Sequence, residues 1–286
     1  MGVRIHVPLG GRYAFFNSPY PSHKENTGVD IYPNGDFGAL APSPVEGEVI
    51  LERRVRAPKG NGFKASDHDT VIIIKNRDNP DTVTKLLHVD PIIETGEWIS
   101  VGDSIGRTLR SGYYGWGTSP HVHVEVRDPL DPIRARGGYR MNLIDKPMGH
   151  PVEDLTGYVV HTQPEYAMIA LDSKCLGLVG TINDAPAVLD GGIPYYGWLG
   201  AHMVDAPEFG TIDLLGKPIA DITEAFHKSC KAECRDYRFM INEKPILGLS
   251  LTLWPSLKPV VKAIPLERNG LKLSNGDLVQ VELKVS

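Results

Sequence analysis

The chain has 286 residues, of which 41% are hydrophobic and 23% are charged, a balance typical of globular proteins rather than disordered or membrane-embedded ones. This length suits two domains of ordinary size. The formal net charge of −5, without a long basic run, argues against a nucleic-acid partner. The 30 glycines and 23 prolines predict many turns and short strands, so we expect a mostly β protein.

The N-terminal sequence has no apolar stretch long enough for a signal peptide. No later segment reaches the roughly 18 apolar residues of a membrane span, so we expect no membrane partner. The odd count of 3 cysteines does not suggest a disulfide framework and suits a reducing compartment. These features predict a cytoplasmic protein.

The first informative segment is the short strand predicted at residues 26–32, Asn-Thr-Gly-Val-Asp-Ile-Tyr. Its Asp30 follows an apolar residue and a glycine, and a buried aspartate needs a metal, a base or backbone donors as a partner. An aspartate that ends a turn and is capped by its own backbone is the commoner case. Asp30 is therefore a candidate whose partners must be sought elsewhere in the chain.

The next segments predict a series of strands. Residues 41–50 are typical of a turn followed by a strand, and residues 51–67 are basic and predict an exposed hairpin connection rather than a phosphate site. Residues 70–75 predict a buried strand, and residues 82–89 predict its neighbour. This last strand places His88 at its end.

An aromatic, glycine-rich loop follows a Gly-Asp turn at residues 96–106. Tyr113, Tyr114 and Trp116 in this loop are candidates for the wall of a substrate groove. Stacking of these rings within a β-edge is an equal alternative.

Residues 117–126 predict the strand that carries the strongest chemical signal. Alternation on a strand places His121, His123 and Glu125 on one face and the intervening valines on the other. Two imidazoles two residues apart lie side by side, close enough to serve one metal or one water. The alternative is a solvated polar face that happens to carry two histidines.

The order of these segments resembles that of the lysostaphin-type zinc metallopeptidases, also called the LytM or duplicated-hybrid-motif family. Thr-Gly-Val-Asp, Pro-Val-x-Gly-x-Val, Leu-His, Val-Gly-Asp-x-Ile-Gly and Ser-Pro-His-x-His-x-Glu-Val follow one another over roughly residues 20–130. The resemblance implies an antiparallel β-sheet domain with its site in a groove between loops. It also implies a hydrolase that cleaves a peptide or amide bond through a metal-activated water.

The same resemblance implies roles for four residues. Asp30 and His123 match the second and third metal ligands of the family. His121 matches the catalytic histidine of the His-x-His motif, and His88 matches the other histidine that flanks the water.

The first ligand of the family does not carry over, because Asn26 stands where the family has histidine. A neutral amide is a weak ligand for zinc. His23, three residues earlier, is a substitute if the loop doubles back. Zn²⁺ is the expected ion if any metal is bound, with Mn²⁺ or Fe²⁺ and an empty site as the other options.

Two functions from different classes therefore remain open. The first is a metal-dependent hydrolase, either on a peptide or amide bond or, with a changed metal, on a small substrate. The second is a catalytically inactive family member that acts as a binding or regulatory protein, because Asn26 replaces the first ligand.

Glycines and prolines between residues 137 and 151 predict a boundary between a metallopeptidase-like domain (residues 1–146) and a β-rich accessory domain of unknown role (residues 147–286). The second domain could mediate an oligomer. Its one predicted helix runs from Asp221 to about Asp236, with Asp221 as the N-cap and Glu224 three residues later.

His227, Cys230 and Cys234 would lie on one face of that helix. A metal or redox site there is the less favoured hypothesis, because cysteine packs as a small hydrophobic residue and no second cysteine pair exists.

Overall fold

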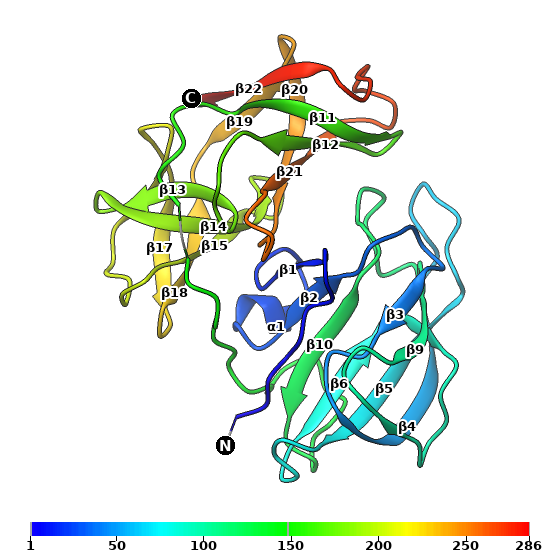
Figure 1. The fold of residues 1–286 in the computed structure, drawn as a ribbon. Coiled ribbons are helices and arrows are strands. Elements are labelled where there is room, and N and C mark those ends of the chain that lie inside the picture. Colours follow the sequence, from blue (N-terminus) through cyan, green and yellow to red (C-terminus); the bar gives the residue numbers. More distant parts are fainter. Residues whose placement is uncertain (1, 148, 286) are drawn as a thin grey trace. The chain divides into compact units, whose positions relative to one another are not determined.

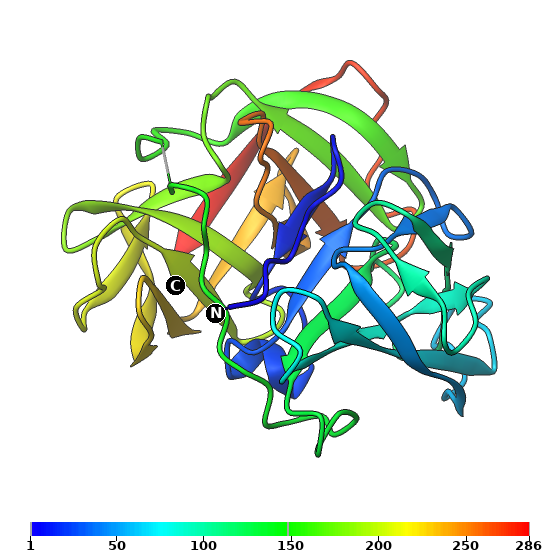
Figure 2. The same ribbon diagram turned by 60° about the horizontal axis from the view of Figure 1, so that its bottom comes forward.

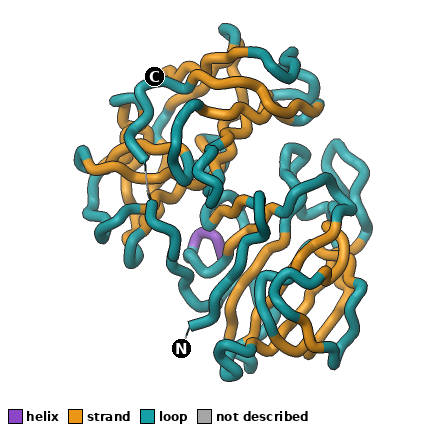
Figure 3. Tube along the Cα trace, in the orientation of Figure 1, coloured by secondary structure: helices purple, strands orange, loops and turns teal. Residues whose placement is uncertain are grey.

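The computed structural model describes residues 2–147 and 149–285. Nearly all regular structure is β-strand (Figure 3), which confirms the predicted mostly β class. The chain divides into two compact units. The first unit is the chain up to Tyr13 together with Tyr20–Met141, and the second unit is Ala14–Pro19 together with the chain from Asn142 onward.

The first unit contains a seven-stranded sheet in the order β1-β2-β10-β6-β5-β4-β8 and a three-stranded sheet in the order β3-β9-β7 (Figure 1). The strands are β1 (Arg12–Ala14), β2 (Val29–Tyr32), β3 (Leu40–Pro42), β4 (Gly47–Arg56), β5 (His68–Asn76), β6 (Val83–Leu87), β7 (Val89–Pro91), β8 (Trp98–Ile99), β9 (Ser104–Thr108) and β10 (Val122–Arg127).

Strand β10 lies between β2 and β6 and pairs with both in antiparallel register (Figures 1 and 2). All of its residues are buried, so its two faces both pack against protein. His123 stands opposite Asp30 of β2 on one side and opposite Leu87 of β6 on the other. This register brings the histidine strand, the Asp30 strand and the end of the His88 strand together.

Within the described residues, the only helix is the single turn α1 (Pro21–Lys24). Proline at its start suits the first helical position, where no N–H donor is needed. No described helix is long and apolar enough to cross a membrane.

The second unit is a twelve-stranded antiparallel sheet that closes on itself twice. The closures are the additional pairings β13–β14 and β20–β21, which produce two rings of six strands joined by the β14–β20 pair. The strands are β11 (Thr156–Gln163), β12 (Tyr166–Leu171), β13 (Leu178–Ile182), β14 (Ala185–Ile193), β15 (Trp198–His202), β16 (Thr211–Leu214), β17 (Lys217–Ala225), β18 (Ser229–Cys234), β19 (Tyr237–Ile241), β20 (Lys244–Leu251), β21 (Val260–Pro265) and β22 (Leu278–Val285).

The two rings have the same cyclic order of neighbours but different chain connections. Their neighbour orders are β13-β14-β15-β18-β17-β16 and β19-β20-β21-β12-β11-β22, which match when the second ring is treated as a circular permutation that starts at β19 and continues from β22 to β11. One apolar cluster fills both rings, with Leu189 and Leu199 from one and Ile169 and Phe239 from the other. The second unit therefore has its own core.

The predicted helix from Asp221 to about Asp236 is wrong, because this segment forms the antiparallel pair β17 and β18. Asp221 does not cap a helix; its carboxylate accepts two hydrogen bonds from the Arg235 guanidinium, at 2.6 and 2.9 Å. A separation of four residues is about one helical turn and also two full strand repeats, so Cys230 and Cys234 share a face in either structure. His227 lies exposed in the turn, and Cys230 packs in the core.

The segment Ala14–Pro19 is anchored in the second unit mainly by Phe16, whose side chain is fully buried. Its ring packs against Trp198 and Phe226 and occupies the space where Gly200 has no side chain. The backbone N–H of Phe15 donates a hydrogen bond of 2.6 Å to Asp190.

Gly200→Ala is expected to lower the free energy of unfolding by about 1–3 kcal/mol, because a methyl group at this position would overlap the buried Phe16 ring. Urea denaturation measures this change. Gly115→Ala is the matched control, since a methyl group there would meet only the Thr118 hydroxyl at 3.4 Å. Equal unfolding midpoints for the two variants would contradict the assigned packing.

Cys230 is expected to resist alkylation by iodoacetamide in the folded protein. Burial raises the pKa of its thiol to about 12, so at about pH 8 the reactive thiolate is scarce and the sulfur is inaccessible. Peptide mass spectrometry should find this cysteine labelled only after unfolding in guanidinium chloride. Comparable labelling of folded and unfolded protein would show that the β18 face is open.

Candidate functional site

Three buried side chains from α1, β2 and β10 bring potential metal ligands together. His23, Asp30 and His123 are 0%, 1% and 2% exposed. The Asp30 Oδ1 atom lies 3.2 Å from His23 Nε2 and 2.8 Å from His123 Nδ1, and these two nitrogens are 3.1 Å apart. Among the described residues, no other trio of histidine, cysteine, aspartate and glutamate side chains was found to converge in this way.

Local structure explains why His23 reaches this position. The turn of α1 places His23 on the buried side, and the Thr27 N–H closes the loop by donating to the Ser22 carbonyl at 2.8 Å. Asn26 has a φ of 55°, a left-handed conformation that asparagine tolerates better than most residues. The chain thereby turns back into β2. This reversal is what allows His23 to take the ligand position that the motif assigns to residue 26.

The Asn26 side chain makes its own contact at the edge of this loop. Its amide nitrogen donates a hydrogen bond of 3.0 Å to the Met141 carbonyl. The converging trio thus contains His23, whereas the Asn26 amide nitrogen is engaged with the backbone.

The donor set of the trio suits a divalent transition metal. Two imidazole nitrogens and one carboxylate oxygen are ligands that zinc accepts. A tetrahedral ion with bonds of about 2.0–2.1 Å separates its ligand atoms by about 3.3 Å. The observed edges of 2.8, 3.1 and 3.2 Å are slightly shorter, so an outward shift of a few tenths of an ångström would accommodate an ion.

A buried ionic cluster orients His123 from behind. Its Nε2 atom lies 3.0 Å from Glu125 Oε1, and Glu125 is held at 2.6 Å by both Lys85 and Arg127. Burial alone would raise the pKa of Glu125, but His123 and Lys85 lower it to about 2. An ionised Glu125 accepts a hydrogen bond from Nε2–H of His123, so Nδ1, which lies 2.8 Å from Asp30 Oδ1, is the nitrogen that would bind a metal ion.

His121 occupies a different environment. Its Nδ1 atom lies 3.0 Å from the Ser119 carbonyl, which can only accept a hydrogen bond, so Nδ1 carries the proton. Burial lowers the pKa of His121 to about 4, against the opposing charge of Asp30. The Nε2 lone pair of this neutral ring lies 3.5 Å from Asp30 Oδ2, an oxygen that accepts no hydrogen bond from any residue the structure describes.

His88 lies at the break between β6 and β7, with a φ of 69° that is uncommon for a residue other than glycine. Its Nδ1 atom is 2.6 Å from Asp69 Oδ2. The ring packs against His121, with centroids 5.2 Å apart, and lies 6.3 Å from the His123 ring. The structure therefore brings all three predicted histidines of the motif together with His23 and Asp30.

The aromatic loop contributes one ring to this cluster. Tyr114 is buried between His88 and His121, at centroid distances of 4.8 and 4.9 Å. Tyr113 is 60% exposed, and its hydroxyl donates to the Arg56 carbonyl at 3.3 Å. Trp116 is half-buried, and among the described contacts of these three loop residues, those with the histidines are made by Tyr114.

Sequence reasoning missed the charged residues that support the histidines. Glu125 was placed on the correct face but given no role, and Asp69, Lys85 and Arg127 were not singled out. Their signal in the sequence was a charged residue within or beside a strand that is otherwise apolar, such as Lys85 before Leu86-Leu87.

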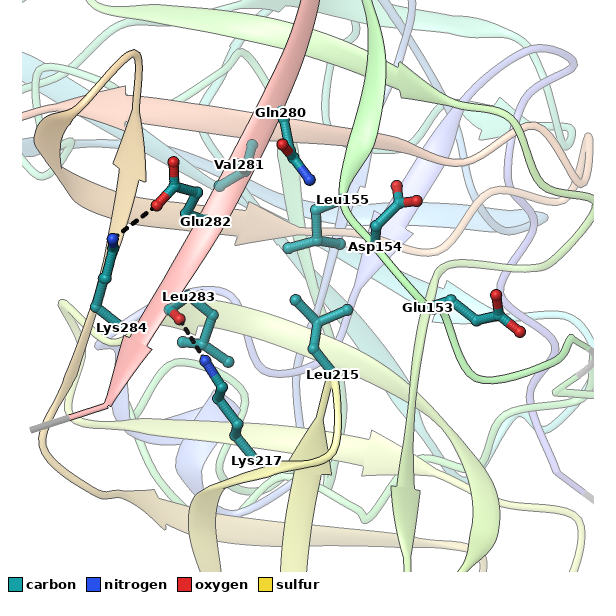
Figure 4. Close-up of a pocket in the computed structure, with 10 residues that line it drawn as sticks. All are labelled: Glu153, Asp154, Leu155, Leu215, Lys217, Gln280, Val281, Glu282, Leu283 and Lys284. Carbon is teal, nitrogen blue, oxygen red and sulfur yellow. Dashed lines mark hydrogen bonds and ion pairs between the residues drawn. The ribbon is translucent and has the colours of Figure 1, made fainter.

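A separate pocket of about 300 Å³ lies within the second unit, on β22 and its neighbours (Figure 4). Lys217 donates to the Leu283 carbonyl at 2.9 Å, and Lys284 pairs with Glu282 at 2.8 Å. Both lysines of this pocket are thus paired, and the Asp154 carboxylate accepts from the Thr156 N–H, so the pocket offers no arrangement comparable to the histidine cluster.

Comparison with known families assigns both halves of the chain. Residues 7–143 match the family described as "Domain of unknown function (DUF8155) N-terminal domain", and residues 150–284 match the corresponding C-terminal domain. Only the chain ends and a short connecting segment lie outside these two matches. The chain therefore belongs to this family. No curated protein matches the chain.

Solved structures similar to the chain include three peptidase-related proteins. Lysostaphin, an antimicrobial peptidase from Staphylococcus simulans, is 13% identical, with 97% of this chain and 99% of that chain covered and a TM-score of 0.30. The catalytic domain of the prophage-encoded M23 protein EnpA from Enterococcus faecalis is 24% identical over 39% of this chain and 72% of its own, with a TM-score of 0.26. The deep-sea M23 metalloprotease pseudoalterin is 14% identical over 45% of this chain and 71% of its own, with a TM-score of 0.28. Because these TM-scores are low, the similarity does not assign chemistry to this chain. Its chemistry is inferred from its own side chains.

Arg127→Met is expected to cost about 3–5 kcal/mol of folding free energy, because it leaves the buried Glu125 carboxylate without one of its two cationic partners. Urea denaturation provides the measurement. Arg134→Met is the control, since this side chain is 83% exposed and lies 3.6 Å from Asp131. A loss no larger than that of the control would mean that the cluster does not depend on the charge of Arg127.

Proposed function

We propose that the first unit binds a divalent transition metal, with Zn²⁺ as the first candidate, and hydrolyses a peptide or amide bond. The observation that carries this proposal is the convergence of the His23, Asp30 and His123 ligand atoms within 3.2 Å of one another. Mn²⁺ and Fe²⁺ also accept a mixed set of imidazole and carboxylate ligands.

An ion bound by these three residues would supply Lewis acidity, which lowers the pKa of water and polarises a carbonyl group. His88 and His121 lie beside the trio and carry the remaining proton-transfer and hydrogen-bonding capacity of the cluster. One of them can accept a proton from the attacking water, and the other can stabilise the oxygen of the substrate carbonyl. These roles agree with those implied by the sequence resemblance.

The order of motifs supports a peptide or amide substrate, since it resembles that of peptide-cleaving enzymes over most of the first unit. The exposed ring of Tyr113 is the best placed of the three aromatic candidates to contact such a substrate. Tyr114, by contrast, supports the histidine rings from within the protein.

A second candidate is a binding protein that keeps the metal but does not turn over substrate. Two observations favour it: Asn26 occupies the position of the first ligand in the sequence motif, and all three converging ligands are nearly inaccessible. Metal binding is common to both candidates, so hydrolysis is the property that separates them.

His23→Ala is expected to weaken Zn²⁺ binding more than 100-fold, because it removes one of three direct ligands and even indirect partners of a metal contribute 10–100-fold. Plasma mass spectrometry of the purified protein and calorimetric titration of the metal-free protein provide the measurements. His123→Ala should behave in the same way. Asn26→Gly removes the amide that contacts Met141 but keeps the left-handed φ of 55° accessible, and it should retain binding within a few-fold.

The opposite pattern, with binding lost in Asn26→Gly and kept in His23→Ala, would show that Asn26 and not His23 is the ligand. Hydrolysis is tested by incubating the zinc-loaded protein with purified peptidoglycan fragments and with a casein digest, and by counting new amino termini by mass spectrometry. His121→Ala is the negative control. Stoichiometric metal without any new termini would favour the binding protein.

A further inference from the structure

The carboxylate of Asp69 is fully occupied by hydrogen bonds around His88. Its Oδ2 atom accepts from His88 Nδ1 at 2.6 Å and from the Ser111 hydroxyl at 2.5 Å. Its Oδ1 atom accepts from the backbone N–H groups of His88 at 2.9 Å and of Thr70 at 2.7 Å. Asp69 therefore holds His88 through both its ring and its backbone.

This double contact coincides with backbone strain. A φ of 69° at a residue other than glycine is strained and persists only where the surroundings enforce it. The Asp69 carboxylate, anchored by Thr70 of β5 and Ser111 of the aromatic loop, supplies that enforcement. The strained conformation fixes the direction of the His88 ring at the edge of the histidine cluster.

The charge state of Asp69 determines the tautomer of His88. Burial would raise the pKa of Asp69, but the nearby His88 ring and the donated hydrogen bonds keep it below its ordinary value. An ionised carboxylate only accepts hydrogen bonds, so His88 Nδ1 must carry a proton. When the ring is neutral, the lone pair then resides on Nε2.

We propose that Asp69 is a positioning residue that holds His88 in the Nδ1–H tautomer, and that His88 Nε2 is the proton acceptor of the hydrolytic site. This inference rests on the proposed function for its catalytic part, whereas the tautomer itself does not require a metal. In the reaction, Nε2 takes a proton from water as the water oxygen bonds to the carbonyl carbon. The same proton then passes to the amine as the carbon–nitrogen bond breaks, which yields a carboxylic acid and an amine.

His121 is less suited to accept the proton. Its Nδ1 donates to the neutral Ser119 carbonyl, whereas Nδ1 of His88 donates to a carboxylate that stabilises the imidazolium once it forms. The groups that face His88 are Asp69 on β5, Ser111 and Tyr114 on the aromatic loop, and the rings of His121 and His123 on β10. Only Asp69 among them is a carboxylate.

Asp69→Asn tests this assignment because it replaces one oxygen with an N–H donor. The two backbone N–H groups cannot turn away, so the remaining oxygen should stay with them and the amide nitrogen should face His88 Nδ1. The ring is then expected to change to the Nε2–H tautomer, which cannot accept a proton at Nε2. The change would lower kcat by about 100- to 10,000-fold with little effect on KM.

Long-range ¹H–¹⁵N correlation spectra of histidine-labelled protein report the tautomer directly, with His88→Gln to assign the signals. The expected result is Nδ1–H in the native chain and in Ser111→Ala, and Nε2–H in Asp69→Asn. Asp67→Asn is the matched control, since the Asp67 side chain is 99% exposed and its carboxylate lies 3.1 Å from His68 Nδ1. It should leave the His88 signals unchanged.

The Nε2–H tautomer in the native chain would overturn the inference, and this measurement does not depend on any variant folding. An unchanged tautomer in folded Asp69→Asn would also overturn it. Zn²⁺ titration separates this failure from failure of the proposed function, because Asp69 contacts none of the three proposed ligands. Native zinc affinity in Asp69→Asn together with the tautomer change would support both.

Discussion

The buried carboxylate of Asp30 is the constraint on which the first unit depends. An aspartate that is 1% exposed requires compensation for its charge. Burial raises its pKa, yet the imidazoles of His121, His23 and His123 hold it well below its usual range. The register of β2 with β10 places His123 directly opposite it, and the turn of α1 delivers His23. A bound cation would compensate this charge more completely than neutral imidazoles do.

The sequence predicted those parts of the site that follow from local periodicity. Alternation along residues 121–125 predicts His121, His123 and Glu125 on one face. In the structure His121 and His123 both lie beside Asp30, and Glu125 contacts His123. Spacing along a strand could not predict that His23 joins Asp30, because the contact depends on a helical turn and on the left-handed Asn26 that reverses the chain. Asp69 could not be predicted to face His88, since the contact joins residues 19 positions apart across two strands.

The mostly β class was predictable from composition, but the closure of strands into two rings was not. Pairing between distant strands, such as β11 with β22, is set by packing over the whole unit and leaves no short-range pattern. The segment from Asp221 to Asp236 shows the reverse problem, where a capping pattern and a four-residue spacing favoured a helix. The core that receives Cys230 and Ala232 is built from other strands, and this tertiary packing outweighed the local signal.

The three histidines of the motif differ mainly in what lies behind each ring. Ionised Glu125 fixes a proton on Nε2 of His123 and turns Nδ1 toward Asp30, the orientation that a metal ligand needs. Asp69 fixes a proton on Nδ1 of His88 and leaves the lone pair on Nε2, as a proton acceptor needs. His121 has only a backbone carbonyl at the same position and stays neutral. The three side chains are identical, but each ring donates to a different hydrogen-bond acceptor. The acceptor determines which nitrogen carries the proton and therefore what each histidine can do chemically.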